Sequence, residues 1–181
     1  NPRFAVAAGM NYAISKGPFP FWGAPSRDQV STLAGKKPDF GPDALLPEYR
    51  LAEQHLRDNG AGHPKSCWQL AYTGSVGSQS ILGIPHVHAL RNARDDLKIW
   101  PFETGLVALG DDALAGVKVL VAEIYPSLVT SKAERGEVLD EVQVREIARH
   151  YSALDEKGQL GAAFGAPEDL DPSSIPQIQS E

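Results

Sequence analysis

The feature that most limits the fold is an apolar run at residues 117–122, broken by one lysine and enclosed by Gly116 and Pro126. A β-branched run between turn-forming residues is typical of a strand that is buried on both faces of a sheet. The run leads to Glu123. A carboxylate at the end of a buried strand is costly unless it is paired with another group or has a functional role. The sequence therefore predicts a central strand at residues 117–125, with Glu123 as the first candidate for a functional residue.

Neighbouring segments predict the rest of a small sheet. Residues 97–102 alternate polar and apolar side chains up to a proline, and residues 67–72 fit a second short strand. Helices are predicted near residues 80–82, from Pro85 through residues 86–96, and at residues 140–154. The resulting order favours an α/β fold, with a small mixed sheet of about two to four strands flanked by helices. The apolar face of the last helix is expected to consist of Val142, Val144, Ile147, Ala148, Tyr151 and Leu154.

Prolines set the character of the first third of the chain. Eight of the 14 prolines lie within the first 65 residues, so only short helices fit between them, at residues 3–15 and 47–57. We expect residues 1–65 to form an irregular, Pro-rich helical cover and residues 66–164 to form the α/β core.

The two ends of the chain carry further expectations. Residues 165–181 contain three prolines, four acidic residues and no basic residue, which predicts an extended acidic tail. The chain starts at Asn1, and Met10 is its only methionine. We therefore expect one domain overall that is a fragment of a longer protein.

The composition indicates which partners and which cellular compartment the protein has. A formal net charge of -6 argues against a protein whose main partner is nucleic acid, although a local basic groove stays open. The single cysteine, Cys67, excludes an internal disulfide and fits the reducing cytoplasm. No run approaches the roughly 18 apolar residues that a membrane helix needs. We expect a cytoplasmic protein with no membrane partner.

Glu123 has two interpretations. It could hold a divalent cation, Mg²⁺ or Mn²⁺, or act as a general base, because hard cations take carboxylate oxygens. It could instead pair with an arginine or cap the following turn. A metal site needs further ligands, for which Asp140 is the first candidate, with Glu141 and Glu103 behind it.

The turn at residues 74–79 is the second candidate site. Gly74, Ser75, Gly77 and Ser78 could expose backbone N–H groups to a phosphate at a helix N-terminus. The turn lacks the ending of a P-loop and the spacing of a dinucleotide fingerprint. Ordinary turn and capping chemistry is the competing interpretation.

Histidine and cysteine spacing does not favour zinc. His63 and Cys67 are four residues apart, and His86 and His88 are two apart. Residues two apart on a helix point to different sides, and structural zinc takes four closely paired ligands. We expect no zinc.

A family resemblance is carried by five segments, residues 65–70, 74–79, 82–85, 100–103 and 122–127. Together they resemble a group of uncharacterised, mostly alphaproteobacterial proteins, which is similar to a branch of the predicted RNase-H-like nucleases. Members often carry labels from molybdopterin-guanine dinucleotide or cobalamin biosynthesis.

The resemblance implies a fold and a set of metal ligands. It implies that this chain is the C-terminal part of an RNase-H-like domain, in which Glu123 matches the ligand on a later strand. Asp140 matches the ligand near a C-terminal helix. The acidic residue of the first strand has no counterpart, so the resemblance implies that the fragment alone lacks one ligand.

Three functions follow as hypotheses. The first is a fragment of a metal-dependent, RNase-H-like phosphodiesterase or nuclease, a hydrolase acting on a nucleotide or nucleic-acid substrate. The second is a nucleotide-binding protein of a molybdopterin or cobalamin cofactor pathway. The third is a non-catalytic interaction module, which forms a homodimer through an exposed sheet edge.

Overall fold

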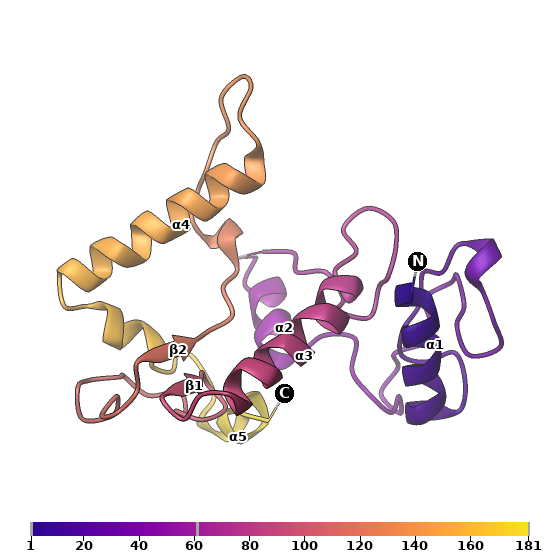
Figure 1. Cartoon of the computed structure of the whole chain (residues 1–181), viewed down its shortest axis with the longest axis horizontal. Coiled ribbons are helices and arrows are strands. Elements are labelled where there is room, and N and C mark those ends of the chain that lie inside the picture. Colours follow the sequence, from indigo (N-terminus) through magenta and orange to yellow (C-terminus); the bar gives the residue numbers. More distant parts are fainter. Residues whose placement is uncertain (1, 61, 181) are drawn as a thin grey trace. The chain divides into compact units, whose positions relative to one another are not determined.

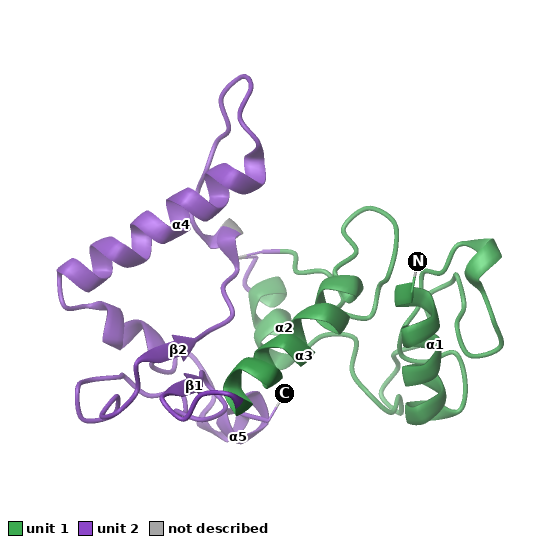
Figure 2. Ribbon diagram, viewed as in Figure 1, with its two compact units in different colours: residues 1–58, 63–92 green, residues 59–62, 93–181 purple. Residues whose placement is uncertain are grey.

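The computed structural model describes residues 2–60 and 62–180, and over these residues it contains five α-helices and one two-stranded parallel sheet (Figure 1). The mixed α/β class predicted from the sequence is confirmed, whereas the RNase-H-like origin of the sheet stays a prediction. The chain divides into two compact units (Figure 2), which are described separately below. Unit 1 comprises residues 1–58 and 63–92, and unit 2 comprises residues 59–62 and 93–181. The three-part division expected from the sequence stays a prediction.

Unit 1 contains three helices: α1 (Pro2–Ser15), α2 (Leu51–Asp58) and α3 (Gly77–Asn92). The helix predicted at residues 3–15 is confirmed, and proline at its first position fits because that N–H would have no helical acceptor. The core packs one side of α1 against loop residues rather than against a sheet. Its buried members are Phe4, Ala7, Phe21, Ala24, Leu33, Leu70 and Ala71.

A buried side chain amide, that of Asn11, joins α1 to the loops that follow it. Asn11 is fully buried, and its Nδ2 donates to the carbonyl oxygens of Phe21 at 2.9 Å and Thr32 at 2.8 Å. Its Oδ1 accepts from the Phe21 N–H at 2.8 Å. These three bonds satisfy both ends of the amide, which is the condition for burying it without a large cost.

The strand predicted at residues 67–72 is wrong as an extended strand. Only Gln69 forms a bridge, with Trp22, and Trp22 bridges Ala34 on its other side. The Trp22 N–H donates to the Trp68 carbonyl at 3.1 Å, and the Leu70 N–H donates to the Trp22 carbonyl at 2.9 Å. Loop segments thus take the place of a sheet, because single bridges satisfy the backbone groups near Trp22 without a longer ladder.

Helix α3 differs from the two helical pieces predicted around Pro85. It runs without a break from Gly77 to Asn92, with Pro85 inside it. A proline in a helix interior removes one N–H bond and crowds the preceding turn. It therefore weakens the ladder at one point, and here the flanking turns stay helical.

Unit 2 is built around strands β1 (Leu97–Ile99) and β2 (Val119–Val121), which pair in parallel with Leu97 opposite Val119. The central strand is shorter than the predicted residues 117–125, and all three of its residues are only half-buried. The prediction of burial on both faces is therefore wrong, because a strand with one neighbour has too little structure around it to cover both faces.

Helix α4 (Leu139–Glu156) is the longest helix of unit 2 and confirms the helix predicted at residues 140–154. It buries Val142 and Ile147, whereas Val144 is 61% exposed. Residues two apart on a helix point to different sides, so Val144 was wrongly placed on the apolar face.

The sequence predicted an extended tail at residues 165–181. The structure contains a short helix there, α5 (Ile175–Ile178), after a short 3₁₀ turn. Another 3₁₀ turn, Leu160–Phe164, lies closer to the sheet: the Trp100 Nε1–H donates to the Phe164 carbonyl at 3.0 Å. The two aromatic rings meet edge to face, with centroids 5.9 Å apart. This contact ties the segment after α4 to the end of β1.

The Asn11 contacts predict a clear loss of stability for Asn11→Ala. The substitution leaves the Phe21 N–H and two carbonyls without their buried partner, and each such loss costs on the order of 1 kcal/mol or more. We expect the free energy of unfolding of unit 1 to fall by about 3 kcal/mol, measured by urea denaturation with tryptophan fluorescence. Asn92→Ala, at the exposed end of α3, is the matched control and should change it by less than about 0.5 kcal/mol. An equal effect of both substitutions would contradict the assignment.

Candidate functional site

The turn before α3 is held by its own backbone. Tyr72 and Gly74 have positive φ angles of 75° and 79°, and the Ser75 N–H donates to the Tyr72 carbonyl at 3.1 Å. The Gly77 N–H donates to the Gln69 carbonyl at 2.8 Å. The N–H groups of Ser75 and Gly77, which the sequence analysis suggested as phosphate donors, therefore already have acceptors within unit 1.

Gly77 is required by close packing. A Cβ placed on it would lie 2.6 Å from the Gln69 carbonyl oxygen and 2.9 Å from that of Cys67. Such distances leave no room for a side chain. The first residue of α3 is thus pressed against the segment that carries Trp68, and its glycine is explained without a ligand.

Gly74 has a different neighbour, the aliphatic chain of Lys65. A Cβ on Gly74 would lie 2.9 Å from Lys65 Cε and 3.2 Å from Lys65 Cδ. The aliphatic stem of Lys65 therefore lies against the turn at Gly74. The positive φ of Gly74 and the contact with Lys65 both favour glycine at this position.

A second cation reaches the beginning of α3 from α1. Arg3 Nη1 lies 3.5 Å from the Ser78 Oγ, a long hydrogen bond, and Ser78 Oγ is 3.2 Å from Gln79 Oε1. The first turn of α3 contains no acidic residue. Arg3 at Ser78 and Lys65 at Gly74 each bring positive charge to part of this segment, and the helix dipole favours an anion at the beginning of α3.

Sequence reasoning selected the turn but missed both cations. Ser78 and Arg3 are 75 positions apart, and no local pattern links them. Lys65 lies in the segment at residues 65–70 that carries the family resemblance, yet its contact with Gly74 depends on how the loop folds back.

The two carboxylates proposed as metal ligands, Glu123 and Asp140, are both exposed. Asp140 lies in the first turn of α4, where a negative charge interacts favourably with the helix dipole. Glu103 caps the turn after β1: its Oε2 accepts from the Ile99 N–H at 2.8 Å. Within residues 2–60 and 62–180 there is no group of three or more His, Cys, Asp or Glu side chains arranged to hold a metal.

The remaining histidines and the cysteine have ordinary surroundings. His63, His86 and His88 are exposed, and Cys67 is half-buried and not part of a disulfide. His86 Nδ1 lies 2.6 Å from the Leu82 carbonyl oxygen one turn earlier, and His88 lies 3.3 Å from the amide nitrogen of Asn92. These contacts are local to α3.

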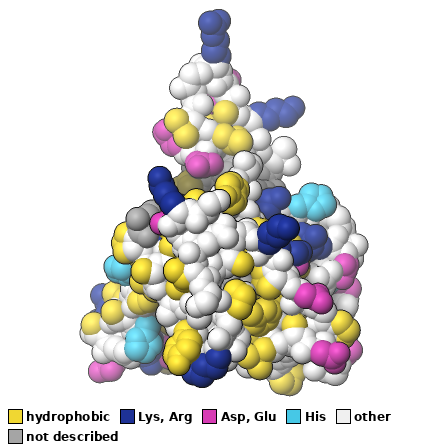
Figure 3. Space-filling model, turned by 90° about the vertical axis from the view of Figure 1, so that its right-hand side faces the viewer, with side chains coloured by type: hydrophobic (Ala, Val, Ile, Leu, Met, Phe, Trp, Pro, Cys, Tyr) yellow, Lys and Arg dark blue, Asp and Glu magenta, His cyan; other side chains and the backbone are white. Residues whose placement is uncertain are grey.

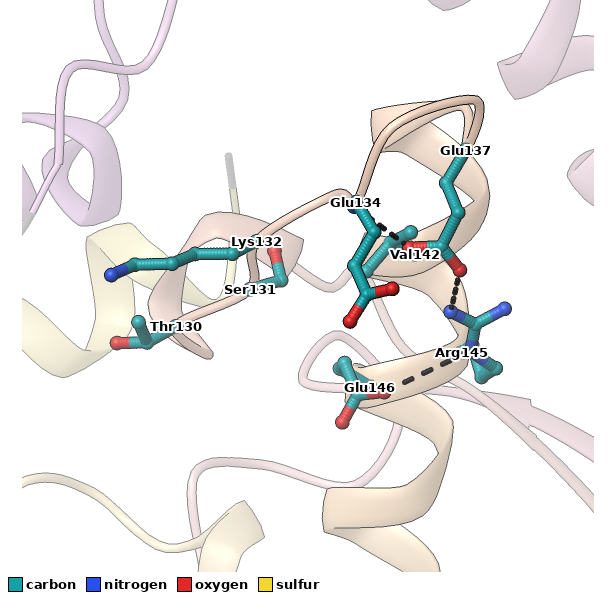
Figure 4. Close-up of a pocket in the computed structure, with 8 residues that line it drawn as sticks. All are labelled: Thr130, Ser131, Lys132, Glu134, Glu137, Val142, Arg145 and Glu146. Carbon is teal, nitrogen blue, oxygen red and sulfur yellow. Dashed lines mark hydrogen bonds and ion pairs between the residues drawn. The ribbon is translucent and has the colours of Figure 1, made fainter.

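A hollow of about 550 Å³ lies in unit 2 between the loop after β2 and the start of α4. Figure 4 shows Arg145 pointing toward Glu137, with Glu146 on its other side. Arg145 Nη2 is 2.8 Å from Glu137 Oε1, and Glu137 Oε2 also accepts from the Glu134 N–H at 2.9 Å. Arg145 is thus surrounded by carboxylates, which makes this hollow a poor place for an anionic ligand. The hollow is lined by Thr130, Ser131, Lys132, Glu134, Glu137, Val142, Arg145 and Glu146.

The packing of Gly77 predicts that Gly77→Ala destabilises unit 1. Forcing a methyl group against two carbonyl oxygens costs on the order of 1–3 kcal/mol. The control is Gly9→Ala within α1, where a Cβ meets nothing within 4 Å and alanine should add up to about 1 kcal/mol. Thermal denaturation should give opposite shifts of the melting temperature. A neutral Gly77→Ala would show that the turn can move away from α3.

The pKa of the Glu137 carboxyl is lowered first by the hydrogen bond from the Glu134 backbone and then by Arg145. A lowered pKa contributes stability that is present above the unfolded value and is lost as the pH falls through the folded value. We expect NMR titration to find the Glu137 pKa below its usual 4.5. Arg145→Gln should restore only part of the difference. Complete restoration would show that the backbone bond to Glu134 is not formed.

Comparison with models of protein families, with curated proteins and with solved structures finds no match to this chain. Among the described residues, no helix is both long enough and apolar enough to cross a membrane. The candidate site therefore rests on its own geometry: the first turn of α3, with Arg3 and Lys65 beside it.

Proposed function

We propose that this chain binds a phosphate-bearing small molecule, a nucleotide, with a phosphate group at the N-terminus of α3. The observation that carries the proposal is that Arg3 from α1 and Lys65 from a loop both reach the turn at residues 74–78. The turn itself is held by the backbone bonds of Ser75 and Gly77. Cations beside a helix N-terminus are suited to an oxyanion.

The guanidinium of Arg3 and the ammonium group of Lys65 differ in how they bind a phosphate. Arginine presents several N–H donors in a planar fork and suits a phosphate with two oxygens exposed, whereas lysine acts as a mobile point charge. The Ser78 hydroxyl donates to Gln79 Oε1 and accepts from Arg3, so it positions the guanidinium at this end of the helix. The interaction is electrostatic and exposed, so its strength should fall as salt is added.

The class of nucleotide follows from the family resemblance alone. Proteins labelled as belonging to molybdopterin-guanine dinucleotide or cobalamin pathways handle guanine or pterin nucleotides, so a guanine nucleotide is the first ligand to test. Hydrolysis of phosphodiester bonds at a Mg²⁺ or Mn²⁺ site formed by Glu123 and Asp140, as in an RNase-H-like nuclease, stays a separate prediction. So does a homodimer through the sheet edge. No contact described above favours either of them over the phosphate site.

The test is calorimetric titration of GTP into the full chain and into Arg3→Gln and Lys65→Gln variants. A charge-assisted hydrogen bond contributes roughly 1.5 kcal/mol, which corresponds to about a tenfold change in the dissociation constant. We expect each substitution to weaken binding by about fivefold to tenfold. Lys36→Gln, which removes an exposed lysine from the same unit, should leave the affinity unchanged.

Further variants separate binding from folding. Replacing Gly74 or Gly77 would disturb the turn directly, whereas Lys65→Gln keeps most of the stem that covers Gly74. Arg3→Lys should retain part of the affinity that Arg3→Gln loses, and circular dichroism should match the unsubstituted chain for all variants. Absence of GTP binding, or equal losses in Lys36→Gln and Lys65→Gln, would overturn the proposal.

A further inference from the structure

The turn after α2 consists of two exposed residues, Asn59 and Gly60. Gly60 has a positive φ of 63°, and a Cβ on it would meet nothing within 4 Å. A residue with positive φ just after a helix is normally glycine, because glycine adopts this conformation without a steric cost. The fold therefore accounts for the glycine, and the asparagine before it makes the pair chemically reactive.

An asparagine that precedes glycine undergoes cyclisation. The deprotonated backbone nitrogen of Gly60 attacks Cγ of Asn59 and forms a C–N bond, while the side-chain nitrogen leaves as ammonia and takes up the proton. Water then opens the resulting succinimide ring at one of its two carbonyl groups. The products are aspartate and isoaspartate, whose backbone continues through the side-chain carboxyl group. Glycine favours the attack because it has no Cβ to crowd the nitrogen and its backbone is permissive.

The other asparagines of the chain are Asn1, Asn11 and Asn92, and none of them is followed by glycine. Asn1 is followed by proline, which has no backbone N–H to supply the nucleophile. Asn11 is fully buried, with both ends of its amide bonded to backbone groups. Asn92 is exposed, but it is the last residue of α3 and is followed by alanine. Asn59 is thus the asparagine best placed to react.

We propose that Asn59 is a site of spontaneous deamidation, at which ammonia is lost and water is added to give isoaspartate and aspartate. Each conversion adds one negative charge at the C-terminal end of α2, where the helix dipole disfavours it. Asn59 lies outside the buried core of unit 1, so the modified chain should stay folded. On the face drawn in Figure 3, acidic, basic and hydrophobic side chains are interspersed, and the reaction alters this balance by one charge. The proposal is independent of phosphate binding at α3.

Incubation of the full chain in water enriched in heavy oxygen tests the reaction. Isoelectric focusing should show a more acidic form that accumulates with time, and faster at higher pH, because the attacking nitrogen must lose its proton. Peptide mapping by mass spectrometry, after digestion in ordinary water, should find the heavy oxygen in the peptide that contains Asn59. The peptides that contain Asn11 and Asn92 should stay unlabelled.

Three variants locate the reaction. Asn59→Gln keeps an amide but lengthens the side chain, so a five-membered ring no longer forms and the acidic form should not appear. Gly60→Ala should slow its formation by roughly tenfold, the equivalent of about 1.4 kcal/mol in the activation free energy. Asn92→Gln, which replaces an exposed asparagine that alanine follows, is the matched control and should leave the rate unchanged. Circular dichroism checks that every variant is folded.

The same labelling in urea separates the fold from the sequence. Absence of label from the Asn59 peptide of the folded chain would overturn the proposal. If that peptide then became labelled in urea, the folded turn would be what holds the nitrogen of Gly60 away from the side chain of Asn59. An acidic form that accumulates at the same rate in Asn59→Gln would also overturn the proposal, because the reaction would lie at another residue.

Discussion

The carboxamide of Asn11 is the interaction on which the arrangement of unit 1 depends. It is fully buried and bonded to the backbone of Phe21 twice and of Thr32 once. The same helix places Phe4 and Ala7 in the core. With α1 fixed in this way, Arg3 near its beginning can reach Ser78. A polar contact inside the core thus helps to position α1, which carries the half-buried Arg3.

Helix α3 combines two surfaces with different chemistry. Its first turn is pressed against the Gln69 carbonyl through Gly77 and has cations beside it. The turns that follow carry exposed apolar side chains, of which Leu82 is 63% and Ile84 69% exposed.

The sequence predicted the positions of helices and strands better than it predicted how deeply they are buried. The helices at residues 3–15 and 140–154 follow from periodicity and are confirmed within one or two residues. The run at residues 117–122 forms a parallel strand, yet β2 has only three residues and is half-buried. Hydrophobicity along the chain does not say how many strands or helices will surround a segment. For the same reason, the exposure of α3 was not predictable.

At the candidate site, too, the sequence does not show which distant charged residues will surround a segment. The turn at residues 74–79 could be found from its small residues, but those residues are explained by backbone packing at Gly77 and by Lys65 at Gly74. What makes this segment attractive to an anion is Arg3 at Ser78 and Lys65 at Gly74, and only tertiary structure places these cations there. The net charge of -6 argues against a protein whose main partner is nucleic acid. It does not exclude two cations at one helix end, and that arrangement suits a single phosphate group better than a polymer of them.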